Sequence, residues 1–168
     1  MNGLKTAISY LYKVLKPVST VSNSIGMVAL AAMMFLTAVD VTLRKLANMP
    51  IIGAYEMVQY MLAMTVSLGL AYCAVEKSHV NIDFVTSRLS ARVQNILGSV
   101  TGLLSLIFAG LMTWQTGVYI TQLASSQLLS QVLLIPVYPF VIIVTFGIAV
   151  FSLVLLAHFL EFLLEAMS

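Results

Sequence analysis

The chain has 168 residues, of which 61% are hydrophobic and only 8% charged. A soluble domain carries about 25% charged residues because its surface faces water, so this composition excludes a soluble globular protein. The formal net charge of +2 is too small to indicate a nucleic-acid partner. The single cysteine, Cys73, excludes an internal disulfide, and its apolar flanks favour a small buried residue over a reactive thiol. We therefore expect an integral membrane protein.

The first predicted element is an amphipathic helix over residues 1–16, "MNGLKTAISYLYKVLK". Apolar residues recur there at helical spacing, and Lys5, Lys13 and Lys16 lie among the remaining positions. This pattern is typical of an interfacial helix that lies in the headgroup plane; the alternative is a frayed cytoplasmic tail. Because proline breaks helices, Pro17 is expected to separate this element from the first membrane span.

Four apolar segments follow, at about 19–43, 54–75, 94–119 and 136–160. Each is near the ~20 residues that a hydrocarbon core of roughly 30 Å requires. Lipid demands that every backbone polar group is satisfied within the protein, so these spans are predicted to be helices. The predicted fold class is all-α integral membrane, with residues 17–168 forming one domain of four transmembrane helices. Its short loops favour a compact antiparallel bundle.

Small residues at intervals of four predict where these spans touch one another. Ala63, Ser67 and Ala71 follow this spacing on the second span, and Gly98 and Gly102 follow it on the third. Small residues let helices approach closely in lipid, where hydrophobicity alone supplies no attraction between them. The pattern predicts contact faces and no chemistry.

Lysine and arginine counts predict the topology. The amino-terminal tail and the second loop carry six basic residues, namely Lys5, Lys13, Lys16, Lys77, Arg88 and Arg92. The first loop carries only Arg44 and Lys45, and the third loop carries none. Because basic residues are enriched in cytoplasmic loops, both termini are predicted to be cytoplasmic.

The acids and bases are absent from the middle of every span. None lies within 17–39, 57–75 or 93–157, although an ionisable group in mid-membrane normally marks an ion path or a substrate site. This chain is therefore not expected to carry out transport by itself. Asp40 and Arg44 are four apart, in the favourable order for an ion pair, and Glu56 opens the second span, where an anion suits a helix start. These groups either anchor helix ends or, for Arg44 and Glu56, reach one another or a partner.

The stretch "EKSHVNIDFV", residues 76–85, gathers Glu76, Lys77, His79 and Asp83. A metal site would need further ligands, and the only other histidine, His158, is remote in sequence. A helix start explains more of these residues, with Asn81 as the N-cap and Asp83 in the first turn, where an anion is favoured. We favour the helix start and expect neither a metal nor a cofactor.

Two longer stretches, "RKLANMPIIGAYEMVQYMLAMTVSLGLAYCAVEKSHVNIDFV" and "LLIPVYPFVIIVTFG", carry a family resemblance. The chain resembles the small membrane subunit (DctQ-type) of tripartite ATP-independent periplasmic (TRAP) transporters. The matching positions are Arg44, Glu56, Gly69, His79, Asp83, Pro136 and Tyr138. Two departures, Lys45 where an aromatic residue often stands and Tyr138 where tryptophan is usual, leave the subfamily and the substrate open.

The resemblance implies a scaffold subunit, not an enzyme, of a sodium-coupled, binding-protein-dependent importer of organic acids in the inner membrane. The implied partners are a large multi-span transport subunit that carries the sodium and substrate sites, a periplasmic substrate-binding protein and membrane lipids. The matching residues would then serve assembly or partner contact, and the small subunit would brace the large one and help dock the binding protein.

Two other classes of function stay open at this level. A self-sufficient four-helix transporter acting as a homodimer would need a membrane-embedded carboxylate, for which Asp40 and Glu56 are the candidates, and both lie at the rim. A small membrane enzyme would need a paired acidic motif or a histidine-rich cluster, and the sequence contains neither.

Overall fold

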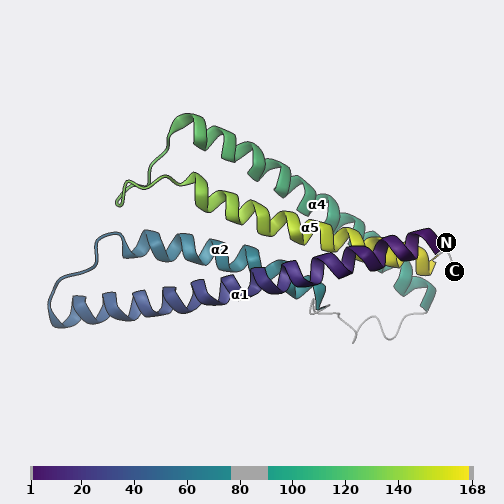
Figure 1. Cartoon of the computed structure of the whole chain (residues 1–168), viewed down its shortest axis with the longest axis horizontal. Helices are drawn as coiled ribbons and strands as arrows, with labels where there is room; N and C mark the ends of the chain where they lie inside the picture. The colour runs from purple at the N-terminus through teal and green to yellow at the C-terminus, as the bar shows by residue number, and fades with distance from the viewer. Residues whose placement is uncertain (1, 77–90, 167–168) are drawn as a thin grey trace.

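The computed structural model describes residues 2–76 and 91–166, with side chains described for 10–76 and 100–161. This part of the chain forms four helices: α1 (Asn2–Leu46), α2 (Ala54–Val75), α4 (Ala91–Ser126) and α5 (Tyr138–Ala166) (Figure 1). Each contains a segment long and apolar enough to cross a membrane. The predicted all-α fold with four spans is confirmed, and α2 has the predicted bounds.

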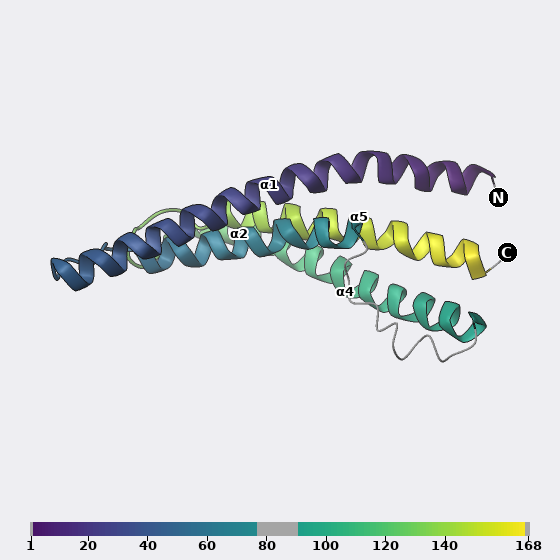
Figure 2. The same ribbon diagram turned by 90° about the horizontal axis from the view of Figure 1, so that it is seen from below.

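The predicted break at Pro17 is wrong, because α1 runs through that residue without interruption. Pro17 is exposed, so its ring points away from the packed face of the helix, where Leu15 and Ser19 are buried. Packing on both sides of Pro17 therefore holds one helix together across it, as neighbouring helices commonly do for membrane prolines. α1 curves along its length (Figure 2). The placement of residues 1–16 at the headgroup layer stays a prediction.

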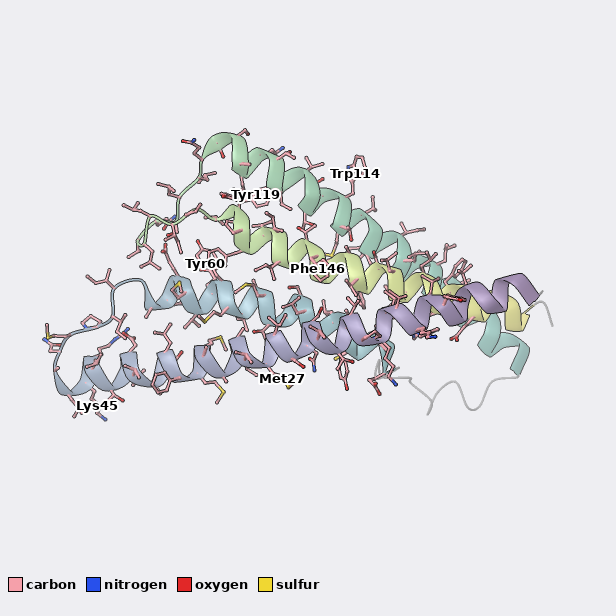
Figure 3. All side chains as sticks on the ribbon, viewed as in Figure 1. Met27, Lys45, Tyr60, Trp114, Tyr119 and Phe146 are labelled. Carbon is pink, nitrogen blue, oxygen red and sulfur yellow. The ribbon has the colours of Figure 1, made fainter. Side chains whose placement is uncertain are left out.

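The helices form a layer in the order α1, α2, α5, α4, instead of a bundle closed around one core (Figures 1 and 2). α2 and α5 lie at the centre, α1 packs on α2 and also contacts α5, and α4 packs on α5. The outer faces of α1 and α4 remain apolar and exposed, for example at Met27 on α1 and Trp114 on α4 (Figure 3). Phe35 and Phe108 are exposed on the same two helices. An apolar face that meets lipid need not close on another helix, so the compact bundle expected from the short loops does not form.

The buried core lies where α1, α2 and α5 meet, and it consists of Leu15, Ala71, Ala74, Val150 and Val154. Along α1 the buried positions recur every three or four residues at Leu15, Ser19, Ser22 and Gly26. The small residues in this stripe allow a close approach, and the Thr65 hydroxyl of α2 donates a hydrogen bond to the Gly26 carbonyl at 3.3 Å.

The predicted small-residue contacts of the second and third spans are only partly correct. Ser67 and Ala71 are buried as expected, whereas Ala63 is exposed. Gly102 faces α5, where an added Cβ would lie 3.8 Å from the Phe159 ring. The spacing therefore identified the contact faces but not how far each of them extends.

α2 and α5 cross with their backbones almost in contact. A Cβ added to Gly147 would lie 2.6 Å from the Ser67 carbonyl oxygen and 2.7 Å from its carbonyl carbon. Nearer the loops, the rings of Tyr60 and Phe140 stack with centroids 4.7 Å apart. Only glycine fits at position 147 without moving one of the two helices.

Candidate functional site

Four of the predicted site residues gather at one end of the molecule, which we call the loop end: the connections 47–53 and 127–137 together with the adjoining helix ends (Figure 1). The opposite end, near both chain termini, is called the terminal end. Arg44, Glu56, Pro136 and Tyr138 lie at the loop end. Gly69 lies within α2, where an added Cβ would face the Asn23 side chain of α1 at 4.0 Å.

Asp40 holds the first connection at the loop end. One of its carboxylate oxygens accepts a hydrogen bond from Arg44 and the other accepts one from the Ile51 N–H, each at 2.7 Å. Asp40 is 6% exposed, whereas the Arg44 side chain is 64% exposed. The predicted Asp40–Arg44 ion pair is thus confirmed. The same carboxylate also fastens the 47–53 connection to α1, which the sequence did not indicate.

Glu56 holds the second connection in a similar way. Its two carboxylate oxygens accept hydrogen bonds from the Val132 and Leu133 N–H groups at 3.0 and 3.1 Å. Glu56 thus reaches the connection between α4 and α5, and Arg44 pairs with Asp40. A carboxylate that accepts two backbone N–H groups makes charge-assisted bonds, which are stronger than neutral ones.

The 127–137 connection folds back on itself before it reaches Glu56. The Ser130 N–H donates to the Ile135 carbonyl at 2.8 Å, and an isolated bridge joins Leu129 and Pro136. Pro136 therefore belongs to this turn, and the fourth helix begins at Tyr138, which corrects the predicted span start. Proline is tolerated there because the hydrogen bonds beside this bridge use the Ser130 and Val137 N–H groups and need none from Pro136.

The 127–137 turn also packs against Gly53, at the start of α2. The Gly53 φ of 80° lies in the left-handed region that favours glycine, and an added Cβ would collide with the Leu133 side chain. Leu133 thus rests on the backbone that leads into α2. The two connections of the loop end are consequently in direct contact.

At the terminal end, the first part of α1 is held to α5. The Tyr12 hydroxyl donates a hydrogen bond to the Glu161 carboxylate at 3.2 Å, and the Tyr12 ring lies 6.0 Å from that of His158. Lys13 and Lys16 are exposed, as predicted for a polar helix face. His79 and Asp83, with the N-cap proposed at Asn81, lie outside the described residues, as does the side chain of Lys5.

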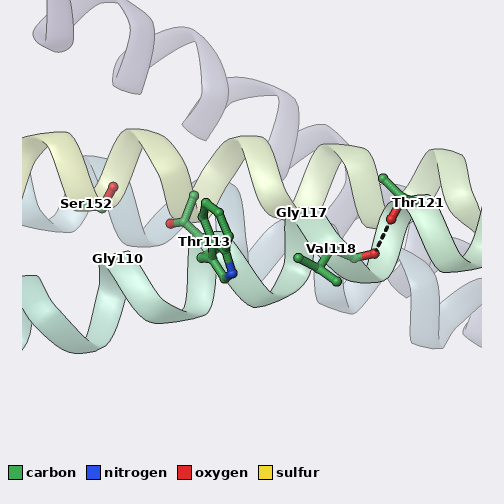
Figure 4. A pocket seen from close by; sticks show the side chains of 7 residues that line it. Gly110, Thr113, Gly117, Val118, Thr121 and Ser152 are labelled. Atoms are coloured by element: carbon green, nitrogen blue, oxygen red, sulfur yellow. Dashed lines mark hydrogen bonds between the residues drawn. The ribbon is translucent and has the colours of Figure 1, made fainter.

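A groove of about 520 Å³ runs along α4 beside α5 (Figure 4). Its lining includes three hydroxyl side chains, Thr113, Thr121 and Ser152. Each donates to a carbonyl of its own helix at 2.7–2.9 Å, so the groove offers an apolar wall to its surroundings. Across the described residues, no group of three or more His, Cys, Asp and Glu side chains is placed to hold a metal ion.

This fold and this site define a class: a multi-pass helical membrane protein whose rim carboxylates bind its own loops and whose outer faces are free to contact lipid or other helices. A family model described as "Tripartite ATP-independent periplasmic transporters, DctQ component" matches residues 33–165. The chain belongs to this family, as the resemblance in its sequence indicated. No curated protein and no solved structure matches the chain.

Membership makes the chain the small membrane subunit of a TRAP transporter, an inner-membrane component and not an enzyme. The family functions with a large membrane subunit and a periplasmic binding protein. The match covers α2 and α4 in full and α5 up to its last residue, and it begins within α1. It therefore includes both carboxylates of the loop end.

Proposed function

We propose that this chain is a scaffold that braces the large transport subunit in the bilayer and carries no substrate or coupling ion itself. The observation that supports this most directly is the use of Asp40 and Glu56. Both carboxylates are engaged with backbone N–H groups of the chain's own connections. An acid held in this way is a structural group, whereas a coupling site needs an acid that can exchange its cation or proton.

The absence of charged residues from the middle of the spans supports the assignment of transport to the large subunit. Residues 57–75 and 93–157 contain no acid or base, so we assign the sodium and organic-acid sites to the large subunit, whose transport this chain supports. The outer faces of α1 and α4 are the surfaces available for that subunit and for lipid. The loop end faces the periplasm when both termini are cytoplasmic, and there the chain would help dock the binding protein.

The test is reconstitution with and without partners. The complete complex in liposomes should take up an organic acid in response to a sodium gradient, and omission of this chain should abolish uptake. The purified chain alone should accumulate nothing. Accumulation by the chain alone, abolished by Asp40→Asn, would replace the scaffold with a self-sufficient homodimeric transporter.

A further inference from the structure

Large apolar side chains cover the loop end, although no other part of the described chain packs over them. Those that are more than half exposed are Leu46, Met49, Ile52, Tyr55, Leu128, Val132 and Leu134. They come from both connections and from the adjoining helix ends. The two connections touch at Gly53 and Leu133, and exposed apolar side chains gathered at one end of a protein mark contact with a membrane or with another protein.

Neither connection contains a charged residue. The sequences "ANMPIIG" at 47–53 and "QLLSQVLLIPV" at 127–137 include only uncharged polar groups, among them Asn48 and Gln131. Connections that face water are usually polar and leave their backbone to the solvent.

The backbone of both connections is satisfied from within the chain at several positions where a water-facing loop would use solvent. The Ile51 N–H is bound by Asp40, and the Val132 and Leu133 N–H groups are bound by Glu56. Further bonds join the Ser130 N–H to Ile135 and the Val137 N–H to Leu128. Internal pairing of this kind is what a segment needs when it enters an apolar medium.

Two basic residues lie beside the apolar surface, at the end of α1, and one of them, Arg44, is paired with Asp40. Arg44 and Lys45 are both exposed at the end of α1, and Lys45 projects from the tip of that helix (Figure 3). Long basic side chains beside apolar ones are typical of the membrane interface, where the stem lies along the acyl region and the charge reaches phosphate groups. The cations therefore favour a lipid surface as the occupant over a second apolar protein surface.

We propose that the loop end is immersed in the boundary between lipid headgroups and acyl chains, with its apolar side chains in contact with lipid and with Lys45 near anionic phosphate. Asp40 and Glu56 make this placement possible because they satisfy the backbone that would otherwise need water. This goes beyond the scaffold function, since it assigns the surface to lipid. Contact with the binding protein would then use polar tips such as Asn48 and Gln131.

The test measures depth by fluorescence in the full-length chain. Trp114 is the only tryptophan, so Trp114→Phe provides a silent background for Ile52→Trp in one connection and Leu128→Trp in the other. Phe108→Trp, exposed on the outer face of α4, is the lipid-facing reference, and free N-acetyltryptophanamide is the water-facing one. Each variant is placed in vesicles of phosphatidylcholine and phosphatidylglycerol, with acyl-brominated lipid or with iodide as the quencher.

Both connection tryptophans should emit at shorter wavelength than the free compound, lose most of their iodide quenching and be quenched by lipid brominated near the headgroup. Iodide quenching close to that of the free compound would overturn the proposal. The measurement is repeated on the complex with the large subunit. Lipid quenching retained there supports lipid as the occupant, whereas its loss on assembly shows that a partner protein covers the surface and overturns the proposal.

A further variant examines the headgroup contact. Lys45→Gln should raise the iodide quenching of the Ile52→Trp probe in vesicles that contain phosphatidylglycerol, because one attraction to the anionic surface is lost. Lys13→Gln removes an exposed lysine at the opposite end and is the matched control, which should change nothing at the probe. If Lys45→Gln left the iodide quenching of the Ile52→Trp probe unchanged, the assignment of this contact to Lys45 would be overturned.

Discussion

The crossing of α2 and α5 and the loop end are held together by different physical means. At the crossing, Gly147 lets the backbone of one helix touch that of the other at Ser67, so the contact depends on shape. At the loop end, Asp40 and Glu56 bind backbone N–H groups of the two connections, so the contact depends on charge. Helices in lipid need small residues to approach one another, whereas connections without regular secondary structure need acceptors for their backbone N–H groups, which the two carboxylates provide.

Breaking the crossing should have the largest effect on stability. Gly147→Val places a side chain where the Ser67 carbonyl already lies, and overpacking of this kind costs about 1–3 kcal/mol or more. We expect a clearly lower midpoint of thermal unfolding in detergent, followed by circular dichroism. Gly110→Val is the matched control, because an added Cβ there meets nothing within 4 Å.

Equal midpoints for the two valine variants would contradict the close approach of α2 and α5. The comparison removes the general effect of a valine in a helix, since both positions are helical glycines in membrane spans. A fall in the Gly110→Val variant alone would indicate that the groove on α4 is occupied in the detergent-solubilised protein.

Removal of the Glu56 carboxylate tests the loop end without touching the crossing. In Glu56→Ala the Val132 and Leu133 N–H groups lose both acceptors, so their amide hydrogen exchange should become faster. Glu56→Gln retains one side-chain oxygen and should give an intermediate rate. If both variants exchanged at the original rate, Glu56 would not hold this connection, and a contact with a partner would become its better explanation.

Asp40 should matter more than Arg44, although only Arg44 was expected to reach beyond its own helix. Asp40→Ala leaves the Ile51 N–H without its acceptor, at a cost of roughly 1–3 kcal/mol. Arg44→Ala removes one exposed member of an ion pair, which is worth roughly 0.2–1 kcal/mol. The thermal unfolding midpoints of the two variants, measured on the isolated chain, show which substitution costs more stability. If the assembled complex lost more stability through Arg44→Ala than through Asp40→Ala, Arg44 would be identified as a partner contact.

The spans were predictable because their signal is local. The bounds of α2 follow from its apolar run between Gly53 and Glu76, and the Asp40–Arg44 pair follows from a spacing of four on one helix. The predicted helix break at Pro17 was wrong because the effect of a proline depends on what packs around it. Leu15 and Ser19 are buried on either side of it and keep α1 continuous, and no local pattern reports that packing.

The roles of the two carboxylates could not be predicted, because they join segments that are distant in sequence. Glu56 accepts hydrogen bonds from Val132 and Leu133, which lie 76 and 77 positions further along the chain. The path of the 127–137 turn also depends on the positive φ at Gln127 and Leu134. Neither residue type announces that conformation. The sequence showed only that Asp40 and Glu56 lie near a connection without charged residues. That pattern is expected equally for acids that bind the connections and for acids that contact a partner.

The smallest effect is expected at Cys73, which the sequence suggested was buried and which is in fact exposed on α2. It lies between the buried positions Ala71 and Ala74, on the side of the helix turned away from the core. Cys73→Ala should therefore leave both the unfolding midpoint and uptake by the complete transporter unchanged, in contrast to Glu56→Ala. Reduced uptake with an unchanged midpoint would place Cys73 at the contact with the large subunit, which would assign that side of α2 to the partner instead of to lipid.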